Sequence, residues 1–295
     1  MIIMKLKSVF ILLFATVTMY AQFPPRPIEI PLWPDGAPTD NAIPADQKER
    51  FDKMAQNLAA TDNPTLTVHK AADPNGTAIL MCPGGAYIGW AGTHEGNDMA
   101  SWMTSQGITF AVLHYRMPNG HKEVPLSDAE QAMRILKGMA GELGVDPDNI
   151  GVMGASAGGH LAASLATLYS SSETRPAFQI LFYPVITMKE GVTHQGSREN
   201  LLGKTPSDED VFKYSLENQV NAQTPQAFIM LSADDTTVPA ENTISYVSAL
   251  IDNKVPVAMH MYPTGDHGWG YRDDFKYKRQ WTGELEKWLG ERIIK

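Results

Sequence analysis

The sequence has only one cysteine, Cys82, among its 295 residues. No disulfide can form within the chain, so folding depends on a hydrophobic core, and a chain of this length can bury one. Cys82 ends an apolar run, which favours a small buried side chain over a reactive thiol.

Positive charge is scarce as well, because 24 Lys and Arg residues stand against 33 Asp and Glu residues and give a formal net charge of -9. The basic residues form no cluster. An acidic surface of this kind repels nucleic acid and anionic lipid, so neither is expected as a partner. The histidines do not stand at metal-ligand spacing, and no phosphate loop or dinucleotide fingerprint occurs. We therefore expect no metal and no cofactor.

The chain also lacks an apolar run of the ~20 residues needed to span a bilayer. Its N-terminus carries two lysines within residues 1–7, a short apolar run over residues 8–19, and the small residue Ala21. This order is typical of a secretory signal peptide. We predict a signal peptide over residues 1–21 with cleavage near Ala21, export to the periplasm or the medium, and no membrane insertion after cleavage.

Apolar residues make up 43 % of the sequence and charged residues 19 %, which is a globular composition. After a proline-rich lead-in over residues 22–44, apolar runs alternate with helical patterns. This alternation predicts an α/β fold, with a doubly wound and mostly parallel sheet in a single domain over residues 22–295. Strands are predicted over residues 77–82, 108–113, 149–153, 178–183, 228–231 and 257–262, and helices over residues 98–105, 126–143, 160–169, 241–253 and 281–289.

Two local features qualify this pattern. The helix over residues 126–143 is predicted to begin with Ser127 or Asp128 as its cap. Residues 187–224 are polar and break the alternation, with one short helical pattern over residues 208–214. We interpret residues 187–224 as a small lid-like insertion, not as a second domain.

The segment Gly154-Ala-Ser156-Ala-Gly158 fits the pattern G-x-S-x-G. A strand is predicted before it and a helix after it, and this is the context in which the motif holds a nucleophilic serine at a sharp corner. Side chains two positions before and after the serine would crowd the backbone there, which explains the two glycines. The alternative is a glycine-rich helix start without chemistry.

A serine hydroxyl is a weak nucleophile at neutral pH and needs a base, together with a group that orients the base. In this fold the chain order is Ser, then Asp or Glu, then His. Of the four histidines after Ser156, His160 lies one helical turn on, His194 lies in the insertion and His260 lies inside a predicted strand. His267 occupies a glycine-punctuated loop after the last strand, from which an imidazole can reach the nucleophile. We predict His267 as the base.

The orienting acid is expected in the loop after the strand over residues 228–231. Two adjacent carboxylates compete there, Asp234 and Asp235. In hydrolases of this kind the acid stands three residues before a Val-Pro pair, and Val238-Pro239 selects Asp235. The other role open to Asp234 is that of a turn residue that binds backbone amides.

The negative charge that develops on the substrate needs an oxyanion hole. The backbone N–H of Ala157, directly after the serine, is one expected donor. The remaining donors are expected in the loop after the strand over residues 77–82, where Gly84 and Gly85 let the backbone turn its amides toward the site.

Five further residues near these loops are candidates for lining the substrate site. They are Tyr87, Trp90, His94, Glu95 and Trp269. The alternative for each is structural: the first four would stitch the loop to the helix that follows, and Trp269, like Asp266, would shape the loop around His267.

At the level of motifs, the sequence resembles the bacterial α/β-hydrolases similar to acetylxylan esterases and related carbohydrate esterases. The resemblance runs from Leu32 to about Trp288. Its carriers are Leu32-Trp-Pro-Asp-Gly-Ala-Pro38, Cys82-Pro-Gly-Gly-Ala-Tyr87, His94-Glu-Gly96, His114-Tyr-Arg-Met117, Pro125-Leu-Ser-Asp128, Gly151-Val-Met-Gly-Ala-Ser-Ala-Gly-Gly-His160, Leu201-Leu-Gly203, Ala233-Asp-Asp-Thr-Thr-Val-Pro239 and Gly265-Asp-His-Gly268.

The resemblance implies a triad of Ser156, Asp235 and His267, and an oxyanion hole formed by Gly85, Ala86 and Ala157. Ala86 departs from the third glycine of many relatives, and it can serve only if its backbone angle suits a residue with a Cβ. The resemblance further implies that the substrate is an acylated plant polysaccharide and that acetate is released.

Three alternatives remain at this level. A peptidase of the prolyl-oligopeptidase kind shares the triad order, although the chain has no N-terminal segment of propeller size. An esterase for feruloyl or other acyl groups would use the same residues. A binding protein with an inactive hydrolase fold would usually have lost a triad residue, whereas all three candidates are present. The residues leave the polysaccharide and the oligomeric state open.

Overall fold

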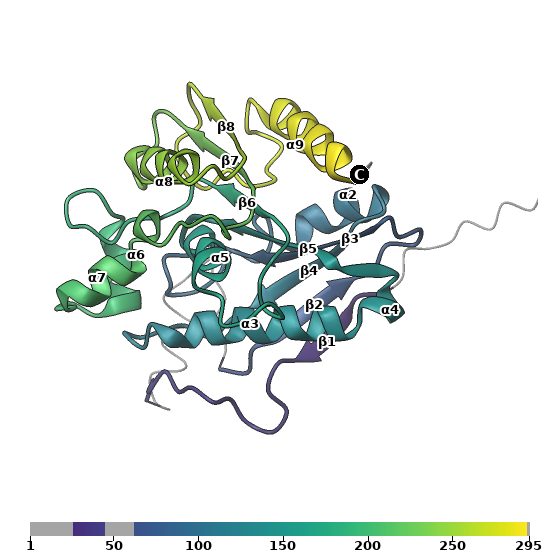
Figure 1. Cartoon of the computed structure of the whole chain (residues 1–295), viewed down its shortest axis with the longest axis horizontal. Coiled ribbons are helices and arrows are strands. Elements are labelled where there is room, and N and C mark those ends of the chain that lie inside the picture. The colour runs from purple at the N-terminus through teal and green to yellow at the C-terminus, as the bar shows by residue number, and fades with distance from the viewer. Residues whose placement is uncertain (1–25, 45–61, 294–295) are drawn as a thin grey trace, which may run out of the picture.

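The computed structural model of the protein describes residues 26–44 and 62–293 (Figure 1), and the predicted signal peptide lies outside them. The strands are β1 (Ile28–Pro31), β2 (Thr65–His69), β3 (Gly76–Cys82), β4 (Thr109–His114), β5 (Val145–Ala155), β6 (Gln179–Phe182), β7 (Ala227–Ser232) and β8 (Val257–Tyr262). Within the described residues they form one sheet in the order β1-β2-β4-β3-β5-β6-β7-β8. Neighbours from β4 through β8 are parallel, and β2 is antiparallel to β1 and β4. The predicted α/β fold with a mostly parallel sheet is confirmed.

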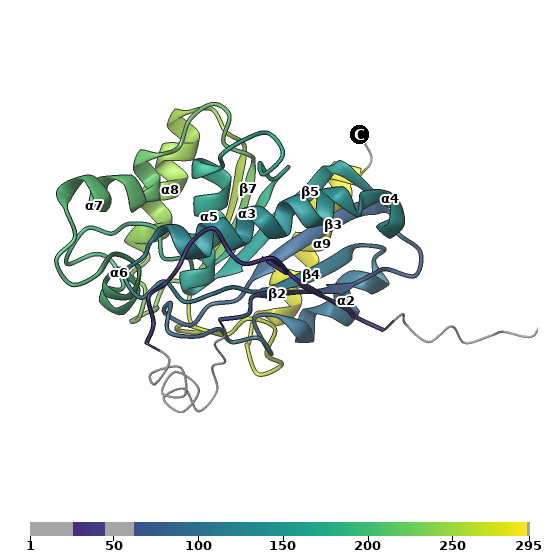
Figure 2. The same ribbon diagram turned by 90° about the horizontal axis from the view of Figure 1, so that it is seen from below.

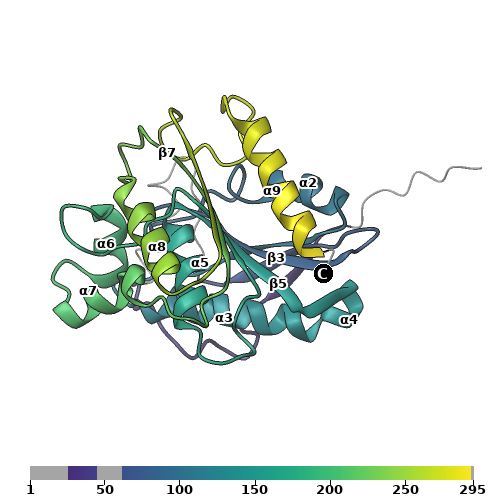
Figure 3. The ribbon, with the colours of Figure 1, turned by 45° about the horizontal axis from the view of Figure 1, so that its top comes forward.

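Helices cover both faces of this sheet (Figure 3). One face carries α3 (Glu123–Gly138), α4 (Ala140–Leu143), α5 (Ser156–Leu168) and α8 (Glu241–Asp252). The other carries α2 (Ala100–Ser105) and α9 (Lys278–Ile293). None of the helices within residues 26–44 and 62–293 combines the length and the apolar character that a bilayer crossing requires.

The central strand β3 explains why both faces must be covered. Its side chains alternate between the two cores, with Leu80 and Cys82 on the side of α3 and α5, and Ile79 and Met81 on the side of α2 and α9. All four are fully buried. A strand buried on both faces appears in the sequence as a continuous apolar run. Cys82 is therefore a buried core residue, and burial raises the pKa of its thiol and keeps it unreactive.

The strands β1 and β2 are not predicted from the sequence, in which no strand is expected before residue 77. β1 lies inside the proline-rich lead-in and is only four residues long. It ends at Pro31 on the edge of the sheet, where a missing N–H is tolerated. β2 alternates between buried and half-buried side chains, which is the period-two pattern of a strand with one covered face.

Several helix boundaries also differ from the prediction. α5 begins at Ser156 instead of residue 160, because its first turn contains the weak helix formers Gly158 and Gly159, which tertiary packing holds in place. The helix predicted over residues 126–143 is interrupted at Met139 and becomes α3 and α4. Gly144, in the left-handed conformation, ends α4. The predicted lid-like segment over residues 187–224 contains α6 (Gln195–Leu202), α7 (Asp208–Tyr214) and the short 3-10 helix η2 (Leu216–Asn218).

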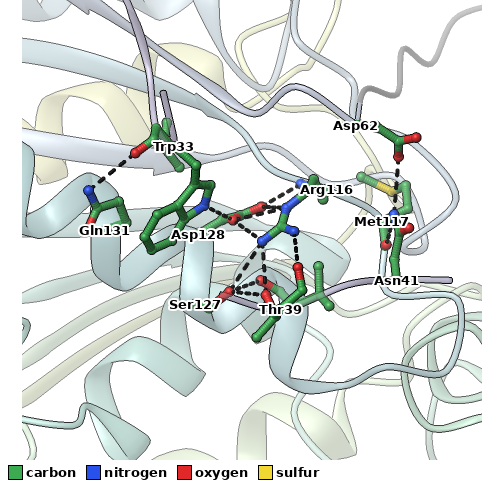
Figure 4. Close-up of polar contacts among 11 residues, drawn as sticks. Trp33, Thr39, Asn41, Asp62, Arg116, Met117, Ser127, Asp128 and Gln131 are labelled. Carbon is green, nitrogen blue, oxygen red and sulfur yellow. Dashed lines mark hydrogen bonds and ion pairs between the residues drawn. The ribbon is translucent and has the colours of Figure 1, made fainter. Parts of the chain in front are cut away.

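The predicted cap of α3 is wrong. The helix begins at Glu123, four residues before Ser127, and no side chain caps it. Asp128 lies inside the helix and is fully buried. Its carboxylate is tolerated there because it forms an ion pair with Arg116 (Figure 4). The Arg116 backbone N–H donates to Asp128 Oδ2 at 2.9 Å, and the guanidinium donates to Oδ1 at 2.7 Å. Removing one partner of such a buried pair typically costs about 3–5 kcal/mol of stability.

The same ion pair fastens the lead-in to the body of the protein. Trp33 Nε1 donates to Asp128 at 2.7 Å, and the Arg116 guanidinium donates to the Thr39 carbonyl oxygen at 2.6 Å (Figure 4). Gln131 of α3 donates to the carbonyl oxygen of Leu32. The lead-in accordingly passes over α3, as the purple segment in Figure 2 shows. Two of the motifs that carry the family resemblance, around residues 116 and 128, thus form one contact.

Candidate active site

Ser156 lies at the corner between β5 and α5. Its backbone has φ +54°, a left-handed conformation that non-glycine residues rarely adopt. A Cβ at Gly154 would overlap the Gly158 carbonyl group, and a Cβ at Gly158 would overlap the carbonyl groups of Cys82 and Pro83. The corner is therefore possible only with glycine at both positions, as the motif predicts.

A chain of hydrogen bonds connects Ser156, His267 and Asp235. His267 Nε2 lies 2.7 Å from Ser156 Oγ, and His267 Nδ1 lies 2.7 Å from Asp235 Oδ2. Since a carboxylate only accepts, Nδ1 carries the proton, and Nε2 is left to accept the hydrogen bond of the serine hydroxyl. The Asp235 side chain is 1 % exposed and that of His267 is 14 % exposed. This arrangement can activate a serine hydroxyl for attack on a carbonyl carbon.

The two neighbouring aspartates have different partners. Asp235 Oδ1 accepts from the backbone N–H groups of Thr237 and Val238, at 2.9 and 2.8 Å, which leaves Oδ2 for His267. Asp234 accepts from the backbone N–H of Asp266 at 2.9 Å, in the role of turn residue considered for it. Only Asp235 of the pair bonds to His267. Asp234 connects the loop that contains both aspartates (residues 233–239, the acid loop) to the loop that contains His267 (residues 263–270, the base loop).

The loop around His267 is also shaped by Asp266, as expected. Its Oδ1 accepts from the backbone N–H of Thr236 at 3.0 Å and from the Thr236 hydroxyl at 3.2 Å. The backbone hydrogen bond is the main reason that the pKa of Asp266 lies below its usual value. The acid loop and the base loop therefore hold each other through hydrogen bonds on both sides of the Asp235–His267 contact.

The loop after β3 contains three consecutive residues with positive φ: Gly85 at +142°, Ala86 at +53° and Tyr87 at +59°. Glycine adopts such angles freely, whereas a left-handed residue with a Cβ costs roughly 1–2 kcal/mol. Asn200 of α6 helps to hold the strained alanine, because its Nδ2 donates to the Ala86 carbonyl oxygen at 2.8 Å. The N–H groups of Gly85 and Ala86 bond to no atom in the described part of the chain. Ala157 lies in the first turn of α5, where N–H groups have no partner within the helix.

The five candidate substrate-lining residues do not form one group. Tyr87, Glu95 and Trp269 are 2 %, 3 % and 4 % exposed, so they offer almost no surface to a substrate, and their structural interpretation holds. Trp90 stacks on the His114 ring at a centroid distance of 4.1 Å. His94 accepts from the Arg272 guanidinium at 3.3 Å, and its carbonyl oxygen binds the N–H of Tyr271.

Three residues that sequence reasoning did not select lie beside the site. Tyr183, at the end of β6, packs its ring on His267 at a centroid distance of 4.6 Å. Asn200 reaches Ala86 as described. His194 is close enough to His267 and Asp235 to interact with both, although burial is the main reason that its pKa is lowered. The insertion therefore reaches the site through α6, and only the order of the strands brings Tyr183 to it.

No group of three or more potential metal ligands occurs among residues 26–44 and 62–293. An activated serine beside free N–H groups at a strand-to-helix corner suits acyl transfer through a tetrahedral intermediate.

Comparison with protein families agrees with this geometry. The family model described as alpha/beta hydrolase fold matches residues 79–270. The chain belongs to this family.

Three relatives illustrate the similarity. The acetylxylan esterase of Xylanibacter ruminicola is 38 % identical over 247 residues, covering 82 % of this chain and 51 % of the relative. Endo-1,4-beta-xylanase B of Butyrivibrio fibrisolvens is 34 % identical over 220 residues, covering 70 % of this chain and 34 % of the relative. The chain thus spans about half of the first curated relative and a third of the second. The crystal structure of an acetyl ester-xyloside bifunctional hydrolase from Caldicellulosiruptor lactoaceticus aligns with TM-score 0.78 and 33 % identity, covering 92 % of this chain and 98 % of that one.

His160, one turn after Ser156, is fully buried and does not reach the site. Its Nε2 lies 2.8 Å from the Tyr214 carbonyl oxygen, which can only accept, so Nε2 carries the proton. Its Nδ1 accepts from the Tyr87 hydroxyl at 2.9 Å. His160 therefore packs and makes hydrogen bonds, as the sequence analysis expects, and it connects the loop after β3 to the insertion.

Burial lowers the pKa of His160 from 6.5 to about 4. The unfolded chain therefore binds a proton at this residue between about pH 6.5 and pH 4, whereas the folded protein does not. We expect the stability that neutral His160 provides to be complete above pH 6.5 and to be lost as the pH falls to about 4, by up to about 3 kcal/mol. Urea unfolding of the protein and of His160→Gln across this range measures the effect. Identical pH dependence in the two proteins would contradict it.

Proposed function

We propose that this protein is a serine esterase that removes acetyl groups from plant polysaccharide. The observation that carries the proposal is the hydrogen-bond chain from Ser156 through His267 to Asp235. The protein belongs to the family described as alpha/beta hydrolase fold. The relatives at 38 % and 33 % identity are an acetylxylan esterase and an acetyl ester-xyloside bifunctional hydrolase. These names support an acylated carbohydrate as substrate.

The mechanism follows from the positions of the atoms. Ser156 Oγ attacks the ester carbonyl carbon while His267 Nε2 takes its proton, and Asp235 stabilises the imidazolium that results. His267 then gives the proton to the departing sugar hydroxyl, which leaves the acetyl group on Ser156. The same imidazole then takes a proton from a water molecule, which attacks the acetyl carbon, and it returns that proton to Ser156 Oγ as the ester bond to the serine breaks and acetic acid is released as acetate. No step requires a metal or a cofactor.

The tetrahedral intermediate carries its negative charge on the former carbonyl oxygen. The N–H groups of Gly85, Ala86 and Ala157 are the proposed donors to this oxygen. Their support is that the first two have no hydrogen-bond partner among the described residues and that the third lies in the first turn of α5, directly after the nucleophile. Loss of one such donor typically lowers turnover about 100- to 1000-fold.

The first test is acetate release from acetylated xylan and from an aryl acetate. We expect release from both, and we expect Ser156→Ala to abolish it because the nucleophile is gone. Methyl ferulate and a chromogenic dipeptide amide are included as competing substrates. Faster turnover of the ferulate would replace acetyl with feruloyl as the acyl group.

Other results of this assay would remove the proposal. Cleavage of the amide in preference to the esters would indicate a peptidase. An intact protein that releases no acid from any ester, and that a fluorophosphonate probe fails to label, would be a binding protein with an inactive hydrolase fold.

The adjacent aspartates provide a matched pair for the second test. Asp235→Asn keeps the shape of the side chain but removes the charge that supports the His267 imidazolium. We expect a fall in kcat of about 10⁴-fold, as when the triad aspartate of a serine protease is replaced by asparagine. Asp234→Asn only weakens the acceptance by Asp234 of hydrogen bonds from the base loop, and we expect kcat to fall less than tenfold. Equal effects on kcat in the two variants would refute the assignment of the acid.

Export is part of the same proposal, because polymeric xylan does not enter a cell. Its support is the pattern of residues 1–21, with two lysines, a short apolar run and Ala21. Expression of the full chain in a bacterium with an intact secretion system is expected to give a protein whose first residue is Gln22. N-terminal sequencing measures this, and a cytoplasmic protein that retains residues 1–21 would contradict it.

A further inference from the structure

Glu95 is a buried carboxylate that lies behind the loop after β3. It is 3 % exposed, and no basic side chain in the described part of the chain forms an ion pair with it. Its Oε2 accepts from the backbone N–H of Gly84 at 2.9 Å, and its Oε1 accepts from the Tyr183 hydroxyl at 2.7 Å. Burying a carboxylate without a basic partner costs free energy, and these two hydrogen bonds offset part of that cost.

Gly84 connects Glu95 to the oxyanion side of the site. A Cβ at Gly84 would lie 2.6 Å from Glu95 Oε2 and 2.9 Å from Ser156 Cβ, so this residue is enclosed between the carboxylate and the nucleophile. Gly85 and Ala86 follow directly, and the strained backbone at Ala86 needs support from its surroundings. The hydrogen bond to Glu95 fixes the peptide plane from which these two donors continue.

Tyr183 connects Glu95 to the base side of the site. Its hydroxyl donates to Glu95 and accepts from the backbone N–H of Gly270 at 2.8 Å, in the loop that carries His267. Its ring packs on the His267 imidazole. Burial is the main cause that raises the pKa of Tyr183 well above its usual value, so the hydroxyl keeps its proton and remains a donor.

The backbone next to Glu95 also touches the base loop. The N–H of Tyr271 donates to the His94 carbonyl oxygen at 2.7 Å. A Cβ at Gly270 would lie 2.5 Å from that oxygen and 3.1 Å from Glu95 Cγ. Segment 94–95 and segment 270–271 are thus in direct contact, with Tyr183 bridging them from the end of β6.

From these contacts we propose that Glu95 is a positioning residue. Its carboxylate holds the loop after β3 through Gly84 and the His267 loop through Tyr183, and so keeps the two loops in a fixed relation on either side of Ser156. The inference rests on the proposed esterase function. Glu95 touches neither the substrate nor the reacting atoms, because Gly84 and Tyr183 stand between. The donors at Gly85 and Ala86 and the base at His267 are needed at the same moment, when the tetrahedral intermediate forms. A link that keeps both loops in place therefore acts mainly on the transition state.

Glu95→Gln is the direct test, because it keeps the shape and removes one acceptor. The glutamine oxygen can still accept from Gly84, but its amide then faces the Tyr183 hydroxyl as a donor, so the hydroxyl proton loses its acceptor and the link from Glu95 to Tyr183 is weakened. We expect kcat per active site to fall about 10- to 100-fold, somewhat less than the loss of a whole donor, while KM changes less than threefold. We expect the inhibition constant of an aryl boronic acid, which mimics the tetrahedral intermediate at Ser156, to rise by a similar factor.

The matched control is Glu130→Gln in α3. Glu130 also accepts from a backbone N–H, that of Ser170 at 2.6 Å, and takes no part in the proposed site. End-point labelling with a fluorophosphonate counts the active sites in each preparation. A merely structural role for Glu95 would lower the thermal stability and the number of sites but would leave kcat per site and the boronic acid affinity at the values of the control.

Tyr183→Phe tests the link from its other end, and it decides the matter if Glu95→Gln does not fold. It removes the hydroxyl between Glu95 and Gly270, and we expect the same pattern, with lower kcat per site and weaker boronic acid binding. Tyr246→Phe is its control, since the buried Tyr246 hydroxyl donates to Gln179 at 3.0 Å on the other face of the sheet.

Three outcomes overturn the inference. The first is that kcat per site in Glu95→Gln stays within threefold of Glu130→Gln. The second is that Tyr183→Phe stays within threefold of Tyr246→Phe, which would leave the bridge without effect even if Glu95→Gln were slow. The third is an unmodified protein without Ser156-dependent ester hydrolysis, which would remove the proposed function and this inference together. In the first two outcomes the esterase function stands and only the role of Glu95 falls.

Discussion

The strained backbone of Ser156 is the constraint on which the remainder of the site depends. Its φ of +54° turns the chain from β5 into α5 within one residue and leaves the hydroxyl beside His267. The turn requires that α5 pack closely against the loop after β3, with the Gly158 backbone next to the carbonyl groups of Cys82 and Pro83. The helix that begins at Ser156 therefore also determines where the loop after β3 starts. Strain of about 1–3 kcal/mol at such a residue persists only because the surrounding packing leaves it no alternative.

Buried polar groups provide much of that packing, and they do so as cross-links between distant segments. Asp128 joins α3 to the lead-in through Arg116 and Trp33. Trp33 and Asp128 are 95 residues apart along the chain. His160 joins α5 to the insertion and to the loop after β3. Glu95 joins the loops on the two sides of Ser156. Because an unpaired polar group is costly inside a protein, each of these side chains tolerates few alternative arrangements of its partners. Glu95 and His160 thus restrict the geometry of the loops beside Ser156.

The sequence predicted the parts of the site that depend on local pattern. Ser156 stands in a five-residue motif between a strand and a helix, and His267 stands in a loop after the last strand, so chain order and turn chemistry suffice to find both. Asp235 was separable from Asp234 by the spacing to Val238-Pro239, and the hydrogen bond to His267 agrees with that choice. The parts that were missed depend on tertiary structure. Tyr183 comes to His267 only because β6 lies beside β5 in the sheet, β1 is too short and proline-flanked to show a period, and the start of α5 is obscured by two glycines whose burial outweighs their low helix propensity. Glu95 and Trp269 were candidates for lining the substrate, and the sequence could not show that both side chains are buried.

The segment over residues 187–224 contacts the candidate site through α6. α6 donates a hydrogen bond from Asn200 to the carbonyl oxygen of Ala86, and His194 at the start of α6 lies within electrostatic reach of His267 and Asp235. Residues 186–192 are anchored to α8, where Asn242 accepts from the backbone N–H groups of Ile186 and Thr187 and donates to the Val192 carbonyl oxygen. A substitution of Asn200 therefore acts on the strained backbone at Ala86. Glu95 holds the same loop at Gly84 through a separate hydrogen bond. The loop after β3 is therefore held at two points, at Ala86 by Asn200 of α6 and at Gly84 by the buried Glu95 carboxylate.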